Sequence, residues 1–251
     1  MAQAIESVLA QQCDEPLCIY IGDDASTDGT SAVCEQYAAR DERIVYLRRE
    51  KNMGLVDNTI DLYRRIIADG CTYVAMLDGD DYWIDPHKLQ TQIDYLRTHP
   101  ETGFVHTASY DAIDGRLVDA DGPDKPVGDL HLRYNLGGAQ HTNSTVLFRT
   151  QLLKETDLDE LQKQHFPVLD YPLYGLFSQH TQFGFIYSYT TAWRNHPSVS
   201  NPQSRKAQRA YKRERLRAWR WLESMYPGSF HYRWYKAFLW YIKQSFYILF
   251  A

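Results

Sequence analysis

Residues 17–24 read LCIYIGDD and residues 73–81 read YVAMLDGDD, so each of two apolar runs ends in a cluster of acidic residues. Short apolar runs of this kind predict buried parallel strands. Ligands of open α/β sheets bind at the carboxyl ends of such strands, which is where both acidic clusters then lie. Carboxylates this close repel one another unless a cation or hydrogen-bond donors separate them. A divalent metal ion is therefore the expected ligand.

Helical patterns alternate with strand patterns along the first half of the chain. We expect helices over residues 3–12, 28–40, 55–69 and 86–99, and strands over residues 17–21, 43–47, 71–77 and 103–110. This order predicts an α/β fold with a mostly parallel sheet and right-handed crossovers. A doubly wound domain normally begins with a strand, and none precedes the first helix. Either the true start lies upstream of Met1 or the fold tolerates the loss.

Composition and charge divide the chain into two parts. The 251 residues are 44% apolar and 24% charged, which suffices for one α/β core. The last 49 residues contain eleven Lys and Arg and two Glu, a net charge of +9, while the remainder has 16 basic and 30 acidic residues, a net of −14. We predict a catalytic domain over residues 1–202 and a basic helical tail over residues 203–251. An acidic body without a nucleic-acid motif argues against nucleic acid as the partner.

Cysteine usage and hydropathy indicate the compartment. The four cysteines form no CxxC pair and do not cluster near histidines, so we expect free thiols rather than a zinc site or disulfides. No signal-peptide pattern opens the sequence, and no apolar stretch reaches the ~18 residues of a membrane span. We expect a cytoplasmic location, either free or at the inner face of the membrane.

Four motifs follow one another between residues 23 and 200. They are DDASTDGT at residues 23–30, NMGLVDN at residues 52–58, DGDDYW with PHKL at residues 78–83 and 86–89, and AWRNHPSVS at residues 192–200. In type and order they resemble the DD-x-S-x-D-G-T, N-x-G-x-x-x-N, D-x-D-D-x-W…P-x-K-L and Y-R-x-H-x-x-S-x-S motifs of family 2 glycosyltransferases. Any one of these motifs alone would be a weak signal.

The resemblance implies a GT-A fold enzyme that moves a sugar from a nucleotide-diphosphate donor to an acceptor hydroxyl with inversion at the anomeric carbon. The departing diphosphate develops negative charge, which a Mg²⁺ or Mn²⁺ ion held by carboxylates would neutralise. By family position, Asp80 would bind this metal. His196 would complete the metal site or touch the diphosphate.

Other residues are assigned to the nucleotide-sugar site by the same resemblance. Asp78 would lie against the ribose or share the metal site, and Asp24 would accept a hydrogen bond from the base. The remaining donor-site candidates are Asp23, Asn52 and Gly54. Each has a structural alternative, since Asp, Asn and Gly are ordinary residues of turns and helix caps.

Inversion requires a base that takes the proton of the acceptor hydroxyl. Asp170 occupies the place where family members carry an acidic residue before a helix, although Leu169 stands where a second acidic residue is often found. Asp157 and Asp159 are alternatives upstream. Asp57 departs from the family pattern because many relatives have an arginine there, near the phosphates.

The tail has two interpretations. Its apolar positions at helical spacing, opposite the arginines, are Ala207, Tyr211, Ala218, Leu222 and Met225, and residues 230–250 are rich in aromatic side chains. A basic amphipathic helix followed by an aromatic segment suits the surface of an anionic membrane. The alternative is a helical pair that packs on the catalytic core or on a second subunit.

Three functions remain open from the sequence. The first is a metal-dependent inverting glycosyltransferase of cell-surface polysaccharide synthesis with a saccharide or lipid-linked saccharide acceptor. The second is a nucleotide-sugar-binding protein of the same fold with impaired turnover. The third is a phosphatase with an aspartate nucleophile among Asp78 and Asp80, which leaves Asp24 and the motif at residues 192–200 without a role.

Overall fold

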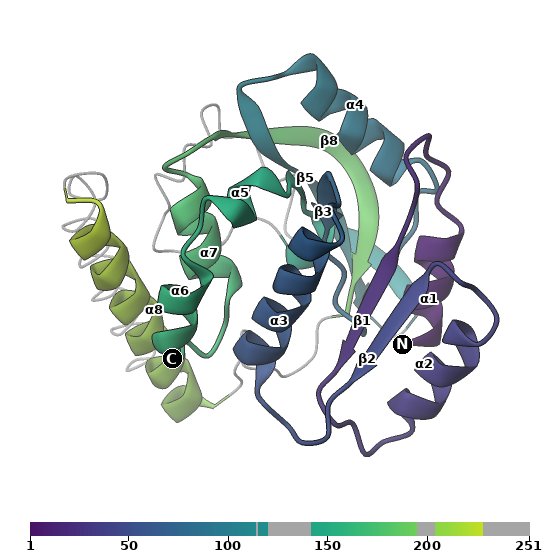
Figure 1. Cartoon of the computed structure of the whole chain (residues 1–251), viewed down its shortest axis with the longest axis horizontal. Coiled ribbons are helices and arrows are strands. Elements are labelled where there is room, and N and C mark those ends of the chain that lie inside the picture. Colours follow the sequence, from purple (N-terminus) through teal and green to yellow (C-terminus); the bar gives the residue numbers. More distant parts are fainter. Residues whose placement is uncertain (114, 120–141, 195–203, 228–251) are drawn as a thin grey trace.

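Two separate sheets form the centre of the computed structural model, which describes residues 1–113, 115–119, 142–194 and 204–227 (Figure 1). The smaller sheet consists of β1 (Ile19–Asp23) and β2 (Ile44–Arg48), which are parallel. The larger sheet has the strand order β3-β7-β5-β8-β4, with β6 beside β5. Its strands are β3 (Tyr73–Ala75), β4 (Tyr82–Trp83), β5 (Thr102–Ile113), β6 (Arg116–Asp119), β7 (Leu147–Arg149) and β8 (Gln182–Trp193).

The larger sheet is mixed, so the prediction of a mostly parallel sheet is wrong there. Only β5 and β8 run parallel, whereas β3 with β7, β5 with β7, β4 with β8 and β5 with β6 are antiparallel in the described part. Parallel neighbours need a crossover of about a dozen residues or more. β5 and β6 are joined by residues 114–115 alone, a connection that permits only an antiparallel hairpin.

Each helix expected in the first half of the chain overlaps a helix of the structure. These are α1 (Ala2–Leu9), α2 (Thr30–Ala38), α3 (Leu55–Ala68) and α4 (Lys88–Thr98). The second half of the described chain adds α5 (Gln151–Lys154), α6 (Leu158–Lys163), α7 (Asp170–Phe177) and α8 (Arg205–Met225), with a short 3₁₀ helix at Asn143–Thr145. Gly70 follows α3 with a φ of +75°, a left-handed conformation that favours glycine at a helix end.

The apolar core has three parts. The largest lies between α3, α7 and the larger sheet and contains Phe104, Phe148 and Tyr174. A second part lies between α4 and the same sheet, and a third joins α1 and α2 to β1 and β2. All four cysteines are free thiols. Within the described residues, no helix combines the length and hydropathy required to span a bilayer.

A cavity of about 1030 Å³ lies between β1 and β3. Each of these strands pairs with a neighbour on one side only within the described part of the chain. Side chains of α1, α3 and α4 contribute to the walls. The two acidic clusters lie at the ends of β1 and β3, so the candidate site lies beside this cavity.

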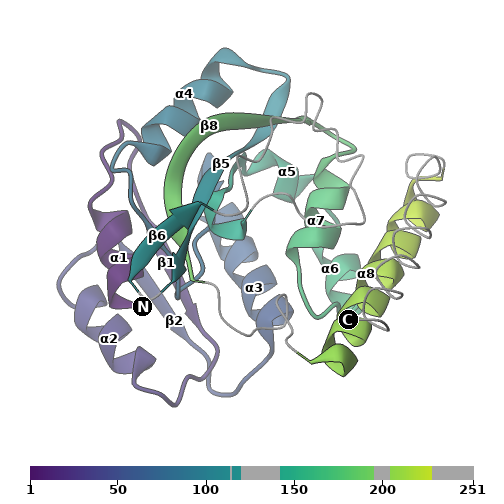
Figure 2. The same cartoon turned by 180° about the vertical axis from the view of Figure 1, so that it is seen from behind.

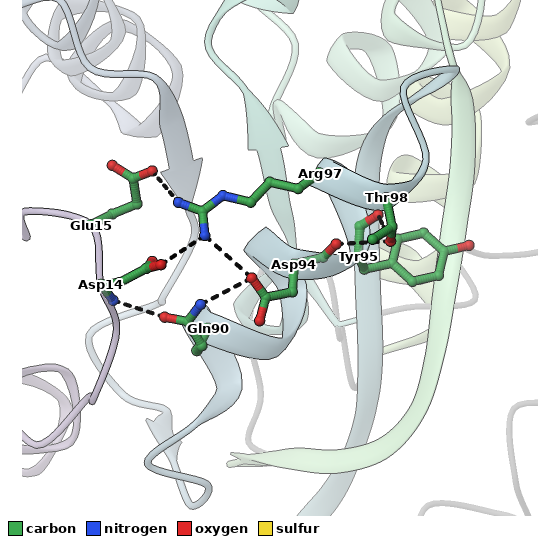
Figure 3. Close-up of polar contacts among 7 residues, drawn as sticks. All are labelled: Asp14, Glu15, Gln90, Asp94, Tyr95, Arg97 and Thr98. Carbon is green, nitrogen blue, oxygen red and sulfur yellow. Dashed lines mark hydrogen bonds and ion pairs between the residues drawn. The ribbon is translucent and has the colours of Figure 1, made fainter.

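Polar contacts fasten the smaller sheet to the rest of the molecule. Arg97 of α4 forms ion pairs with Asp14 (2.8 Å) and Glu15 (2.6 Å) in the segment before β1, and the Gln90 side chain accepts a hydrogen bond from the Asp14 amide (Figure 3). On the other side, the Asn58 side chain of α3 donates to the Gly22 carbonyl at 2.9 Å. β1 therefore keeps its place beside the cavity without pairing to β3.

The tail helix α8 packs along α7 (Figures 1 and 2). A Cβ added to Gly175 of α7 would lie 2.4 Å from Cδ1 of Leu222, so the two helices approach as closely as glycine permits. The expected apolar face is only partly correct, because Ala218 and Leu222 are buried while Ala207 is exposed. Arg215 was expected on the outer face and is instead buried against α7.

Candidate functional site

Asp23 ends β1 and is only 4% exposed. Its carboxylate accepts hydrogen bonds from the Ser26 amide (2.8 Å) and from the hydroxyls of Ser31 (2.6 Å) and Tyr46 (2.6 Å). Burial alone would raise the pKa of Asp23, but these hydrogen bonds outweigh it and leave the pKa well below its usual range. The carboxylate thus stabilises the loop that presents Asp24.

Asp24 brings two of the predicted donor-site residues to the end of β1. Its carboxylate accepts hydrogen bonds from the amides of Met53 (2.6 Å) and Gly54 (2.8 Å), and the Asn52 side chain donates to the Asp24 carbonyl at 3.3 Å. Gly54 has a φ of +91°, which a residue with a Cβ adopts only with strain. The carboxylate therefore holds the turn that begins α3.

Asp78 follows β3 and lines the cavity. Its carboxylate accepts a hydrogen bond from the Asn143 side chain at 3.0 Å, and the Tyr174 hydroxyl donates to Oδ1 of the same Asn143 side chain at 2.6 Å. The Asp78 side chain is exposed to the cavity. The protein atoms around the cavity partly exclude water from the carboxylate, and this desolvation raises the pKa of Asp78 to about 7. The negative charges of neighbouring aspartates act in the same direction.

Asp81 fixes the loop that presents Asp80. It is 1% exposed, and its carboxylate accepts hydrogen bonds from the Ser144 hydroxyl (2.6 Å) and the Arg194 amide (2.9 Å). Burial raises the pKa of Asp81 to about 6, against the effect of these two donors. The Arg194 guanidinium also donates to the Asp80 carbonyl and lies 4.9 Å from the ring centroid of Tyr82. Arg194, which belongs to the fourth sequence motif, thus contacts the second acidic cluster directly.

The carboxylates after β3 fit a hard divalent cation. Asp78 and Asp80 both line the cavity, and their oxygens are ligands that Mg²⁺ and Mn²⁺ accept. Among the described residues, no three His, Cys, Asp or Glu side chains are grouped as a metal site. Mg²⁺ commonly uses one or two carboxylates together with water and substrate phosphates. The predicted ligand His196 lies outside the described residues.

Asp170 is the first residue of α7, and its carboxylate accepts a hydrogen bond from the Tyr171 amide at 2.7 Å. Burial raises the pKa of Asp170, while this hydrogen bond and the positive charge of Arg215 oppose the rise. The two alternative acidic residues have surface contacts instead. Asp157 caps α6 by accepting from the Glu160 amide, and Asp159 forms an ion pair with Arg64.

The cavity unites only some of the candidates. Asp78 and Asp80 line it together with Gly22 of β1 and Arg194, whereas Asp24 and Asp170 do not. Sequence reasoning left the roles of Asn143, Ser144 and Tyr174 unnoticed. The run of polar residues at 142–145, directly before an apolar strand, was the available signal. The contacts of those residues depend on long-range packing.

Acidic clusters thus lie at the carboxyl ends of two strands beside a cavity in an α/β fold, the place where such folds bind ligands. The chain belongs to glycosyl transferase family 2, whose family model matches residues 1–147. The membership confirms the fold and the family that the four motifs indicated.

Relatives with similar sequences are longer than this chain. An uncharacterized protein of Mycobacterium tuberculosis is 40% identical over 101 residues, which cover 40% of this chain and 28% of that protein. The "Putative glycosyltransferase EpsE" of Bacillus subtilis is 35% identical over 108 residues, which cover 43% of this chain and 37% of that protein. The chain thus spans less than half the length of either relative.

Solved structures share the fold at low sequence identity. TarS of S. aureus, solved as residues 1–349 with UDP, matches with a TM-score of 0.57 at 17% identity and covers 86% of this chain and 60% of that one. The mannosyltransferase PcManGT of Pyrobaculum calidifontis, solved with GDP-Man and Mn²⁺, matches with a TM-score of 0.52 at 12% identity and covers 90% of this chain and 67% of that one. Both comparisons concern the fold alone.

Proposed function

We propose that this protein is an inverting, metal-dependent glycosyltransferase that moves a sugar from a nucleotide-diphosphate donor to an acceptor hydroxyl. The main support is geometric: the Asn143 side chain joins Asp78, which follows β3, to Tyr174 of α7, the helix that Asp170 begins. The proposed reaction needs one carboxylate on the donor side and a second carboxylate that acts as the base on the acceptor side. Membership of family 2 supports the same reaction.

On the donor side, the nucleotide is assigned to the rim formed by β1, the turn before α3 and the loop after β3. Asp24, Asn52 and Gly54 shape the first part of this rim, and Asp78 the second. Asp23 acts through its contacts in the loop at residues 23–31. Asp80, with His196, is assigned to a Mg²⁺ or Mn²⁺ ion, which when bound supplies positive charge to the leaving diphosphate.

On the acceptor side, Asp170 takes the proton of the acceptor hydroxyl while the acceptor oxygen forms its bond to the anomeric carbon. The bond between that carbon and the diphosphate breaks, and the nucleoside diphosphate leaves with the electron pair. Attack from the face opposite the leaving group inverts the configuration. Burial of Asp170 suits a base, because desolvation strengthens proton affinity.

A thermal-shift series with UDP, GDP, ADP and CDP tests donor binding, each with Mn²⁺, with Mg²⁺ and with EDTA. We expect one diphosphate to raise the melting temperature by about 3 °C or more at saturation, only when metal is present. Hydrolysis or transfer of the matching nucleotide sugar then tests turnover. No shift with any diphosphate would contradict the proposal, while binding without turnover would favour a nucleotide-sugar-binding protein.

We further propose a role in cell-surface polysaccharide synthesis at the inner face of the membrane, with a saccharide or lipid-linked acceptor. A Bacillus subtilis relative that is 41% identical over 76 residues carries the name of a teichuronic acid biosynthesis glycosyltransferase, which supports this role. The outer face of α8 supports contact with anionic lipid, since it exposes Arg205, Lys206, Arg209, Arg213 and Arg220.

Vesicle sedimentation tests this membrane contact. The variant with Arg209, Arg213 and Arg220 replaced by Gln removes three exposed charges without touching the buried face of α8. At about 1 kcal/mol per basic residue, we expect binding to phosphatidylglycerol vesicles to weaken roughly 100-fold, with no change for phosphatidylcholine vesicles. Equal sedimentation of the variant and the natural protein would contradict the proposed contact.

A further inference from the structure

Ser144 lies against the loop that follows β3 and is fully buried, at the centre of the 3₁₀ helix Asn143–Thr145. Its hydroxyl oxygen accepts a hydrogen bond from the Asp78 amide at 3.1 Å and donates one to the Asp81 carboxylate at 2.6 Å. The Asp81 amide donates to the Asp78 carbonyl at 3.0 Å, which closes the loop into a turn. One side-chain oxygen therefore holds both ends of the loop that carries Asp80.

The position of this hydroxyl is set by the core and not by the loop. The Ser144 carbonyl accepts hydrogen bonds from Nε1 of Trp83 on β4 (2.8 Å) and from the Thr191 hydroxyl on β8 (3.3 Å). The next carbonyl, that of Thr145, accepts from the Gln92 side chain of α4 at 2.9 Å. The three donor residues are buried, and buried hydrogen bonds are costly to leave unmade. Ser144 is thus a rigid support for the loop.

Both hydrogen bonds of the Ser144 hydroxyl use its full chemistry. A hydroxyl has one proton to donate and also accepts through its lone pairs. The Asp78 amide can only donate, so the hydroxyl accepts from it and gives its own proton to the Asp81 carboxylate. Without the hydroxyl, the loop would lose an acceptor at its first residue and a donor at its last. The hydrogen bond from the Arg194 amide to Asp81, at 2.9 Å, would remain.

The 3₁₀ helix supports the side chains of the loop as well as its backbone. Asn143, directly before Ser144, donates from Nδ2 to the Asp78 carboxylate at 3.0 Å, while the Tyr174 hydroxyl of α7 holds Oδ1 of the same amide at 2.6 Å. These contacts and those of Ser144 are made to the residues on either side of Gly79 and Asp80. The short helix therefore bears on the loop where the proposed metal ligand is presented.

We propose that Ser144 is a positioning residue for the divalent metal: its hydroxyl fixes the loop at residues 78–81 from the core, so that the Asp80 carboxylate keeps the place that a metal ion requires. The inference rests on the proposed function, in which Asp80 binds that metal. Groups that orient a metal's ligands typically change its affinity by roughly 10- to 100-fold when they are lost. A serine that served packing alone would change stability and leave the metal affinity as it is.

Mn²⁺ binding tests this role. Free Mn²⁺ is measured by its paramagnetic resonance signal, in the presence of the nucleoside diphosphate that stabilises the protein. We expect Ser144→Ala to weaken Mn²⁺ binding by about 10-fold or more, and Ser144→Cys, which keeps a weaker donor at the same place, to lose less. The matched control is Ser178→Ala, which removes a hydroxyl that donates to the Gly175 carbonyl at 2.7 Å, at the carboxyl end of α7. It should bind Mn²⁺ like the natural protein.

Kinetics separates positioning from general damage. In Ser144→Ala the KM for Mn²⁺ should rise, while kcat at saturating Mn²⁺ should stay within about twofold of the natural value. An Mn²⁺ affinity equal to that of Ser178→Ala, or a lower kcat with an unchanged KM for Mn²⁺, would overturn the proposal. Failure of the proposed function gives a different result, because the natural protein itself then binds no Mn²⁺ with any diphosphate.

Hydrogen exchange tests the contact without metal or substrate. The Asp78 amide loses its acceptor in Ser144→Ala, so exchange in the segment at residues 78–81 should be at least about tenfold faster than in the natural protein. Exchange in α7 should not change, and Ser178→Ala should leave the segment at residues 78–81 unaffected. Unaltered exchange of that segment in Ser144→Ala would show that the hydroxyl does not hold the loop, and the proposal would fail whatever reaction the protein performs.

Discussion

Asp80→Asn is expected to abolish metal-dependent transfer, with a loss of more than about 10²-fold in turnover. The substitution removes one negative charge from the loop after β3 while it keeps the size of the side chain. The Asp80 carboxylate lines the cavity, whereas Asp81 beside it is buried and bound to Ser144 and Arg194, so the loop itself should remain in place. The measurement is turnover of the nucleotide sugar over a Mn²⁺ and Mg²⁺ titration.

Asp94→Asn is the matched control for this substitution. Asp94 lies on the surface of α4 and forms an ion pair with Arg97 at 3.3 Å (Figure 3). An exposed ion pair of this kind contributes little to the stability of the fold. The Asp94→Asn substitution should leave both the turnover and the metal requirement unchanged. An Asp80→Asn protein with normal activity and the normal metal requirement would remove Asp80 from the metal site.

Asp170→Asn is expected to lower turnover by the ~10² to 10⁴ that is typical of a lost general base, with donor affinity preserved. The amide cannot accept the proton of the acceptor hydroxyl. Donor contacts should persist because the assigned donor residues lie on β1, the turn before α3 and the loop after β3. The measurements are turnover at saturating donor and donor affinity by calorimetry.

Asp159→Asn is the control and also tests an alternative base. Asp159 is exposed on α6 and paired with Arg64 at the surface. It should behave as the natural protein. If Asp170→Asn instead loses donor affinity and turns over bound donor normally, the base lies elsewhere, and a loss with Asp159→Asn would identify it.

Local patterns predicted the elements well, because they depend on neighbouring residues. The apolar runs before both acidic clusters form β1 and β3, and Gly70 ends α3 as its position suggests. Strand pairing was predicted less well, since the larger sheet is mixed. Which strands pair depends on contacts between distant segments, such as Phe104 with Phe148, that no local pattern encodes.

The candidate site divides in the same way. Sequence motifs identified Asp24, Asp78, Asp80 and Asp170 as functional candidates, but they do not distinguish a ligand-facing carboxylate from one that serves the fold. In the structure, the carboxylate of Asp23 is occupied by three hydrogen bonds from the protein. That difference arises from donors on separate elements, which are brought together only by folding.

The sequence by itself determined the family, the helices and strands of the first half, and the presence of acidic clusters at the ends of two strands, because each follows from residues close together in the chain. Only the tertiary structure decided that Tyr174 holds Asn143 against Asp78 and that Arg215 is buried beside the helix that carries Asp170. These contacts join residues between 31 and 65 positions apart, or two separate helices. The burial of Arg215 depends on how closely α7 and α8 pack, which the contact between Gly175 and Leu222 illustrates.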